Sequence, residues 1–183
     1  MSDMPGLALT MTAQALLLGG VGPRRLLLGA LIGGVATGIR VQAAVLVVPV
    51  LLVALGEERR RGVWSTGLKA TLAFGLGCLL WAIPLVVATG GIKAYLAALH
   101  SQAGEDFAWV DMLWSNPTPR HIAVALRQTF VLPWASASLA SVVGWLAAAG
   151  ALVMLVRERY ALWVLLVSSV PYVLFHLAFQ ETI

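Results

Sequence analysis

Apolar runs of bilayer length constrain this chain more than any other feature of its sequence. A helix that crosses the hydrocarbon core of a membrane needs about 20 apolar residues, and residues 63–88, 133–156 and 160–180 each supply such a run. The chain is 60% hydrophobic and only 11% charged, whereas soluble domains average about 25% charged residues. These features predict an all-α, polytopic transmembrane helical bundle that forms one domain over residues 1–183, in contact with the lipid bilayer, and argue against a soluble protein.

The apolar run between Leu26 and Leu55 is too long for one membrane span. Its roughly 30 residues would form a helix of about 45 Å, against a hydrocarbon core of about 30 Å. Arg40 lies in the middle of the run, where a charged side chain inside a single span would be costly. We therefore expect two short helices, over residues 26–38 and 42–56, with a break around Arg40 that is packed inside protein or faces water.

Basic residues gather in three clusters beside the apolar runs: Arg24-Arg25, Arg59–Arg61, and Arg157 with Arg159. If the break at Arg40 reverses the chain, all three clusters fall on one side of the membrane, which the positive-inside rule assigns to the cytoplasm. No basic helix stands clear of the apolar runs, so a nucleic-acid partner is not expected. The six expected membrane segments are about 6–20, 26–38, 42–56, 63–88, 133–156 and 160–180.

The outer loop of about 90–132 is expected to be structured. Its first part has apolar residues at helical spacing, which indicates a short amphipathic helix at the membrane interface: Ile92, Tyr95, Leu96 and Leu99. Further on, Thr118 can cap a second helix whose first position is Pro119. That helix would carry an apolar stripe of Ile122, Leu126 and Phe130.

Arg40 is the first candidate for chemistry, because an ionisable residue within a membrane segment suggests a functional site. Facing the outer leaflet, its guanidinium could hold the phosphate of a lipid carrier through two parallel hydrogen bonds. The alternative is an arginine that extends to the outer interface or pairs with a carboxylate. The residues alone leave both interpretations open.

The second candidate is the acidic and aromatic stretch Glu105–Trp114, which contains Glu105, Asp106, Asp111 and Trp114. A carboxylate can act as a general base toward a sugar-accepting hydroxyl, and aromatic faces can bind the apolar face of a sugar. The alternative is an interfacial aromatic belt with solvated acids. By residue type alone, this second interpretation is the favoured one.

The third candidate is the polar end of the last apolar run. His176 and Gln180 are four residues apart and would share a helix face, with Glu181 beside them. This row could contact a substrate headgroup, or it could be a helix end that meets water. The three histidines are scattered and Cys78 is the only cysteine, so the sequence predicts neither a metal site nor a cofactor.

Three stretches together resemble the bacterial GT-C membrane glycosyltransferases, and within them the relatives of dolichyl-phosphate-mannose protein mannosyltransferases and aminoarabinose transferases. Leu27–Arg40, followed by Pro49 and the Arg59 cluster, is similar to that family's paired short helices with a basic residue at the break. Trp81–Leu85, followed by Gly90-Gly91 and Tyr95-Leu96, is similar to a span that leads into an outer loop. Pro171–Thr182 is similar to a late span.

The resemblance implies transfer of a sugar from a polyprenyl-phosphate-linked donor to an acceptor at the outer face of the bacterial inner membrane. Arg40, helped by His176, would hold the lipid phosphate, and Glu105–Trp114 would line the sugar or acceptor pocket. The essential acid that the family carries in its first large outer loop has no counterpart here, so no catalytic residue is assigned. The chain is accordingly expected to be a middle-to-late fragment that acts with the remainder of a parent protein.

A different class of function stays open beside the transferase. The chain could be a non-enzymatic polytopic membrane protein, either a transporter fragment or an assembly subunit. Transporters use broken helices near the membrane midplane, usually in repeated halves. The break at Arg40 agrees with that architecture, but no internal repeat is found in the sequence.

Overall fold

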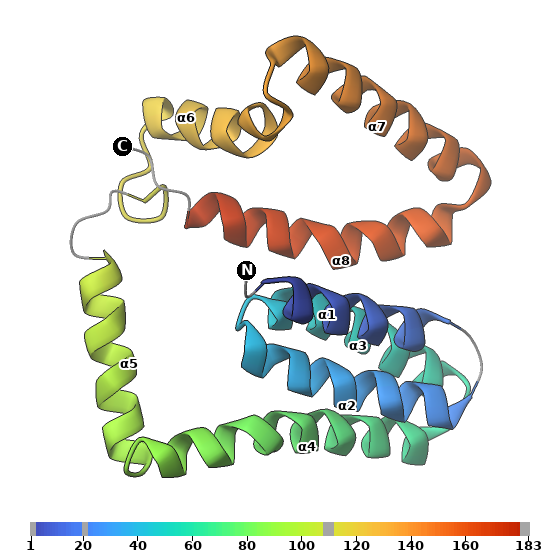
Figure 1. Cartoon of the computed structure of the whole chain (residues 1–183). Coiled ribbons are helices and arrows are strands. Elements are labelled where there is room, and N and C mark those ends of the chain that lie inside the picture. The colour runs from blue at the N-terminus through green and yellow to red at the C-terminus, as the bar shows by residue number, and fades with distance from the viewer. Residues whose placement is uncertain (1–2, 20–21, 108–111, 180–183) are drawn as a thin grey trace. The chain divides into compact units, whose positions relative to one another are not determined.

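The computed structural model describes residues 3–19, 22–107 and 112–179. Within these residues the chain is all-α, as predicted, with eight α-helices and one 3-10 turn (Figure 1). It divides into two compact units, 1–99 and 100–183. The elements are α1 (Asp3–Leu18), α2 (Pro23–Ile39), α3 (Ala43–Arg60), α4 (Trp64–Ala88), α5 (Ile92–Phe107), α6 (Pro119–Phe130), η1 (Leu132–Trp134), α7 (Ala137–Arg157) and α8 (Arg159–Ala178).

In the first unit, α2 is the central helix and packs against α1, α3 and α4. The buried side chains are mostly small or β-branched, which allows the helices to approach closely. The core of the unit consists of Ala13, Leu17, Leu26, Ala30, Val47, Val50, Leu51, Ala54 and Ala70.

Glycines set the spacing between α2 and α4. A Cβ added to Gly34 would overlap the Phe74 carbonyl oxygen and lie 3.0 Å from the Cα of Gly77, and a Cβ added to Gly77 would lie 3.0 Å from the Cα of Gly34. The two helix backbones are therefore in direct contact, as in small-residue packing between membrane helices. Gly33, next to Gly34, likewise abuts Val47 of α3.

A side chain of α1 satisfies the backbone of α3 beside its internal proline. Pro49 has no N–H and disturbs the helical hydrogen bonds of the preceding turn. In that turn, the Leu46 carbonyl accepts a hydrogen bond of 3.0 Å from Nε2 of Gln14. A hydrogen bond from a neighbouring helix thus ties α1 to α3 in the turn before the proline.

The predicted break in the long apolar run is confirmed, because α2 ends at Ile39 and α3 begins at Ala43. The expected helix over 133–156 begins later than predicted, at Ala137. Pro133 lies instead in the 3-10 turn η1, and Ser136 caps α7 by accepting a hydrogen bond from the N–H of Leu139 at 3.2 Å. A side-chain cap therefore decides where α7 begins.

In the second unit, α7 and α8 carry apolar side chains on all their faces and bury none of them. Trp145 is 77% exposed and Val156 is 72% exposed. In water such surfaces would be strongly unfavourable. Among the described residues, α4, α7 and α8 are long and apolar enough to cross a membrane, and these three helices suggest an integral membrane protein in contact with lipid.

The expected outer loop contains two helices within its described residues. The first, α5, continues to Phe107, well beyond the expected stripe that ends at Leu99. The second, α6, begins at Pro119 as predicted. Thr118 is its N-cap, with an extended backbone and a side-chain oxygen that accepts a hydrogen bond from the N–H of His121 at 3.2 Å.

Candidate functional site

Arg40 lies at the break between α2 and α3. Its backbone is extended, with φ −150° and ψ 118°, which ends α2. Its carbonyl accepts a hydrogen bond of 2.9 Å from the N–H of Ala43, which begins the first turn of α3. The residue is exposed, and its Nε donates to Oε1 of Gln42 at 3.3 Å. The break therefore moves the arginine from the middle of one long apolar run to the end of two short helices.

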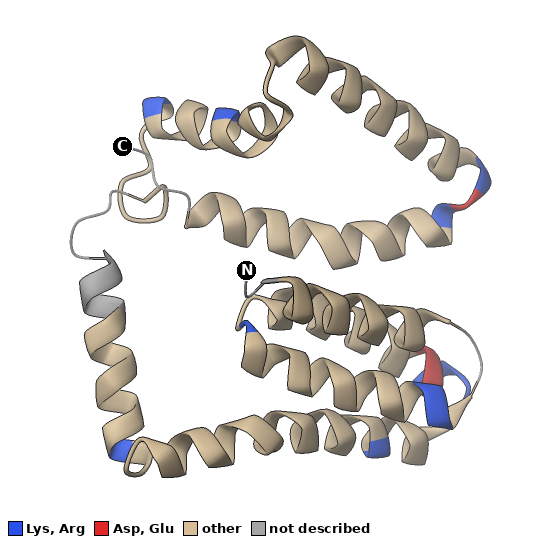
Figure 2. Cartoon of the chain, in the orientation of Figure 1, with Lys and Arg blue, Asp and Glu red and all other residues tan. Residues whose placement is uncertain are grey.

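The hairpin of α2 and α3 separates Arg40 from the basic clusters of the same unit. Arg24-Arg25 lie at the start of α2, Arg59–Arg61 lie at the end of α3, and the two helices pack on each other. Figure 2 shows the charged residues gathered where α2 begins and α3 ends. Arg40 is at the opposite end, about 25 Å away along the 17 residues of α2.

Two side chains support the last turn of α2, immediately before Arg40. Trp81 of α4 donates its indole N–H to the Gly34 carbonyl at 3.1 Å, and Thr37 donates its hydroxyl to the same oxygen at 2.7 Å. A Cβ added to Gly38 would overlap the indole ring of Trp81, so the ring lies directly on the α2 backbone. Contacts with α4 thus position the helix end that carries the arginine.

The first turn of α1 contacts the break from another direction. A Cβ added to Gly6 would lie 3.3 Å from Cγ2 of Ile39 and 3.7 Å from the Cβ of Arg40. Thr10, which is buried, donates its hydroxyl to the Gly6 carbonyl at 2.8 Å. The break is therefore held by α1 and α4, although the sequence singled out only its arginine.

Two candidates from the second unit lie at neighbouring positions. The backbone N–H of Trp114 donates to the carbonyl of Ala178 at 2.9 Å, at the end of α8. His176, two residues before Ala178, has its ring parallel to that of Tyr172, with the centroids 6.4 Å apart. Trp114 is 77% exposed. The structure thus brings the segment of Trp114 to the helix end that carries His176.

The remaining candidates stay predictions. Glu105 and Asp106 belong to α5, so the acidic and aromatic stretch begins as helix, and their side chains are not described. Asp111, Gln180 and Glu181 lie outside the described residues.

His121 is ordered by two hydrogen bonds at the start of α6. Besides the cap to Thr118, its Nδ1 lies 2.7 Å from the Asn116 carbonyl oxygen. A carbonyl oxygen can only accept, so Nδ1 of His121 is the donor in this hydrogen bond. In the described part of the chain, no three His, Cys, Asp or Glu side chains are grouped so that they could hold a metal ion.

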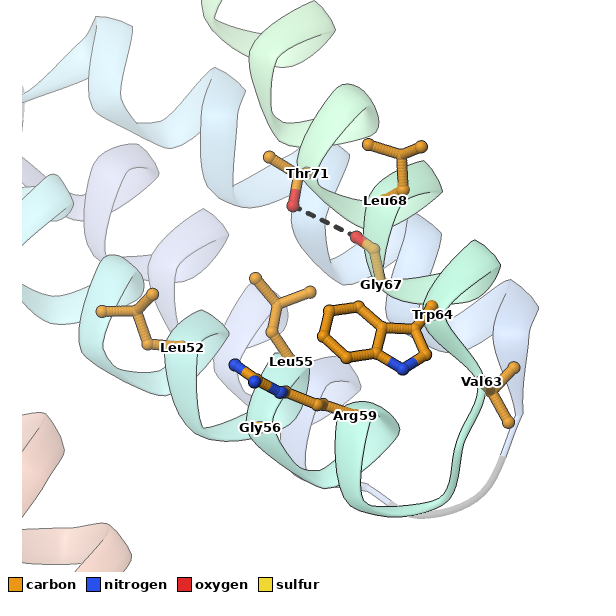
Figure 3. A pocket seen from close by; sticks show the side chains of 9 residues that line it. All are labelled: Leu52, Leu55, Gly56, Arg59, Val63, Trp64, Gly67, Leu68 and Thr71. Carbon is orange, nitrogen blue, oxygen red and sulfur yellow. Dashed lines mark hydrogen bonds between the residues drawn. The ribbon is translucent and has the colours of Figure 1, made fainter.

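A groove of about 420 Å³ lies between the end of α3 and the start of α4 (Figure 3). Arg59 lies over the indole of Trp64 in this groove, with the guanidinium carbon 4.7 Å from the ring centroid. From the sequence, Arg59 was part of a basic cluster beside the second short helix and was not a candidate for binding. The sequence did contain a signal for this groove. Gly56 lies three residues before Arg59 and Gly67 three residues after Trp64, and glycines at these positions leave open space beside the two side chains.

Comparison with known protein families, with curated proteins and with solved structures finds no match to this chain.

Proposed function

We propose that this chain is part of a GT-C type membrane glycosyltransferase, which transfers a sugar from a polyprenyl-phosphate-linked donor to an acceptor at the outer face of a bacterial inner membrane. The observation that carries the proposal is the exposed Arg40 at the turn of a helix hairpin. The basic clusters of the unit lie at the other end of the hairpin. Under the positive-inside rule that basic end is cytoplasmic, which assigns Arg40 to the outer leaflet.

The chemistry of the break suits the phosphate of a lipid carrier. A guanidinium presents several N–H donors in one plane, which match two oxygens of a phosphate group. Gln42 accepts from Nε of Arg40 and thereby orients that plane. Ile39 and Val41, on either side of the arginine, are 46% and 75% exposed, and they offer apolar contact to a prenyl chain.

The proposal includes a six-segment topology, in which α1, α2 and α3 join the three long apolar helices in the membrane. The 17 residues of α2 and the 18 of α3 span about 25 Å and 27 Å, slightly less than the hydrocarbon core. Packing against α4 covers much of this hairpin with protein. The turn at Arg157–Arg159 would then be cytoplasmic, together with the other two basic clusters.

The second unit would contribute to the same reaction through its outer end. The hydrogen bond between Trp114 and Ala178 supports a common surface for Trp114 and His176. In this proposal His176 contacts the headgroup of a substrate. The stretch Glu105–Trp114 lines the pocket of the sugar or its acceptor, and the catalytic residue is not assigned.

Binding of undecaprenyl phosphate to the chain in nanodiscs of neutral lipid tests the role of Arg40. Replacing Arg40 by Gln should weaken binding by about 10- to 100-fold, because a charge-assisted hydrogen bond contributes about 1.5–3 kcal/mol. Arg60→Gln, at the opposite end of α3, is the matched control and should bind like the wild type. Equal affinity of Arg40→Gln and the wild type would refute the phosphate site.

Transfer of radiolabelled sugar from a polyprenyl-phosphate donor, measured in membranes that contain the intact parent protein, tests the enzymatic part. We expect wild-type transfer to acceptor, and a loss of transfer with Arg40→Gln that parallels the loss of binding. Tight binding of the lipid phosphate without any transfer would contradict the glycosyltransferase and favour the non-enzymatic alternative.

A further inference from the structure

The groove between α3 and α4 combines an apolar wall with one cationic group. Leu52, Leu55 and Leu68 line its length, and Arg59 and Trp64 lie at its end near the turn between the helices (Figure 3). Its width comes from two glycines. A Cβ added to Gly56 would meet no atom within 4 Å, and one added to Gly67 would make only an ordinary contact of 3.7 Å with Leu55. The hollow is therefore not closed by neighbouring side chains.

Arg59 is left without a carboxylate partner among the described residues, although two glutamates lie next to it in the sequence. Glu57 and Glu58 both pair with Arg61, at 3.6 Å and 3.5 Å. The guanidinium of Arg59 is instead directed over the indole of Trp64. The positive charge in the groove is therefore available to an anion.

The stacking of Arg59 on Trp64 also determines how an anion would bind. A guanidinium that stacks on an aromatic ring uses its flat face, while its N–H donors point outward in the plane. These in-plane donors suit the two non-bridging oxygens of a phosphodiester. An interfacial Trp next to a basic residue is also the arrangement found where a helix meets lipid headgroups.

We propose that this groove binds an anionic phospholipid of the leaflet that meets the basic end of the first unit. Its phosphate accepts hydrogen bonds from Arg59, and one acyl chain lies along Leu52, Leu55 and Leu68 between α3 and α4. This site lies at the opposite end of the unit from Arg40 and does not depend on the proposed transferase activity.

Native mass spectrometry of the detergent-solubilised chain, titrated with phosphatidylglycerol or phosphatidylcholine of the same acyl chains, tests the proposal. The wild type should retain phosphatidylglycerol at least about tenfold more tightly than phosphatidylcholine, since only the anionic lipid gains from the charge on Arg59. Arg59→Gln should remove this preference. Arg60→Gln is the matched control, because Arg60 does not line the groove, and it should keep the preference.

A second pair of variants tests the apolar part of the site without changing any charge. Gly56→Leu should fill the groove and lower the affinity for phosphatidylglycerol by about tenfold, as expected when a well-packed apolar contact is lost. Gly75→Leu, on α4 outside the groove, also places its side chain in open space and should bind like the wild type.

Three results would overturn the proposal. Equal losses with Arg59→Gln and Arg60→Gln would indicate only diffuse attraction to the basic cluster. Equal retention of the two phospholipids by the wild type would show that the groove binds acyl chains but does not recognise the headgroup. Displacement of phosphatidylglycerol by inorganic phosphate at the same concentration would indicate a site for free phosphate, in which the acyl chain plays no part.

Discussion

Replacement of Gly34 by Ala should separate α2 from α4. The added methyl group would overlap the Phe74 carbonyl oxygen, and it would lie 2.9 Å from the Cys78 nitrogen and 3.0 Å from the Cα of Gly77. All three are backbone atoms of α4, so no side-chain rotation can relieve the contact. The methyl group can be accommodated only if the two helices move apart, along one of the most extensive helix contacts of the first unit.

The expected cost is the difference between two effects. Overpacking of a close contact costs about 1–3 kcal/mol, and the rigid surroundings put this substitution near about 3 kcal/mol. Ala is favoured over Gly within a helix by about 1 kcal/mol. The net loss of unfolding free energy is therefore about 2 kcal/mol, or roughly 30-fold in the unfolding equilibrium constant. Gly75→Ala, with no atom within 4 Å of its added Cβ, should gain up to about 1 kcal/mol from the same helix preference.

Equilibrium unfolding in mixed dodecyl maltoside and SDS micelles measures both variants. Tryptophan fluorescence is a suitable signal, since Trp81 hydrogen-bonds to Gly34 across the same interface. The difference between the two variants cancels the helix preference and isolates overpacking, at about 3 kcal/mol. Equal stability of Gly34→Ala and Gly75→Ala would refute the close approach of α2 and α4.

Two further substitutions test hydrogen bonds that join local structure to packing. Thr118→Ala removes the cap on the N–H of His121 and should cost about 1 kcal/mol. Faster amide hydrogen exchange in the first turn of α6 would report this loss, and unchanged exchange there would contradict the cap. Gln14→Leu leaves the Leu46 carbonyl beside Pro49 without its side-chain donor and should cost about 1–2 kcal/mol. SDS unfolding measures it, with the exposed Thr12→Val of the same helix as control, and a Gln14→Leu variant as stable as this control would argue against the contact.

The helices and many of their ends could be predicted from the sequence, because they depend on residues close together in the chain. The run containing Arg40 had to break, since one span would have held a charge at the membrane centre. Thr118 and Pro119 are a local capping pattern, and α6 begins there. The predicted start of α7 was wrong. Pro133 and Ser136 both qualify as helix starts by their sequence, and the cap that forms is the one at Ser136.

The contacts between helices could not be predicted in the same way. A helix in water shows its buried face by the alternation of apolar and polar residues. On α4, α7 and α8 nearly every position is apolar, so the pattern does not distinguish a lipid-facing side from a packed one. For the same reason, neither the groove at Arg59 nor the contact of Trp114 with the end of α8 was expected.

By itself, the sequence determined that the chain is all-α, that it carries helices able to cross a membrane, and that Arg40 lies at a helix break. These properties follow from hydrophobicity, charge cost and capping, which act over one helix length. Only the tertiary structure decided that Gly34 lies against Gly77, that Trp81 holds the helix end before Arg40, and that Arg59 turns to Trp64 and leaves Glu57 and Glu58 to Arg61. Between apolar helices, close backbone approach and a few polar hydrogen bonds select the contacts, and these depend on residues far apart in the chain.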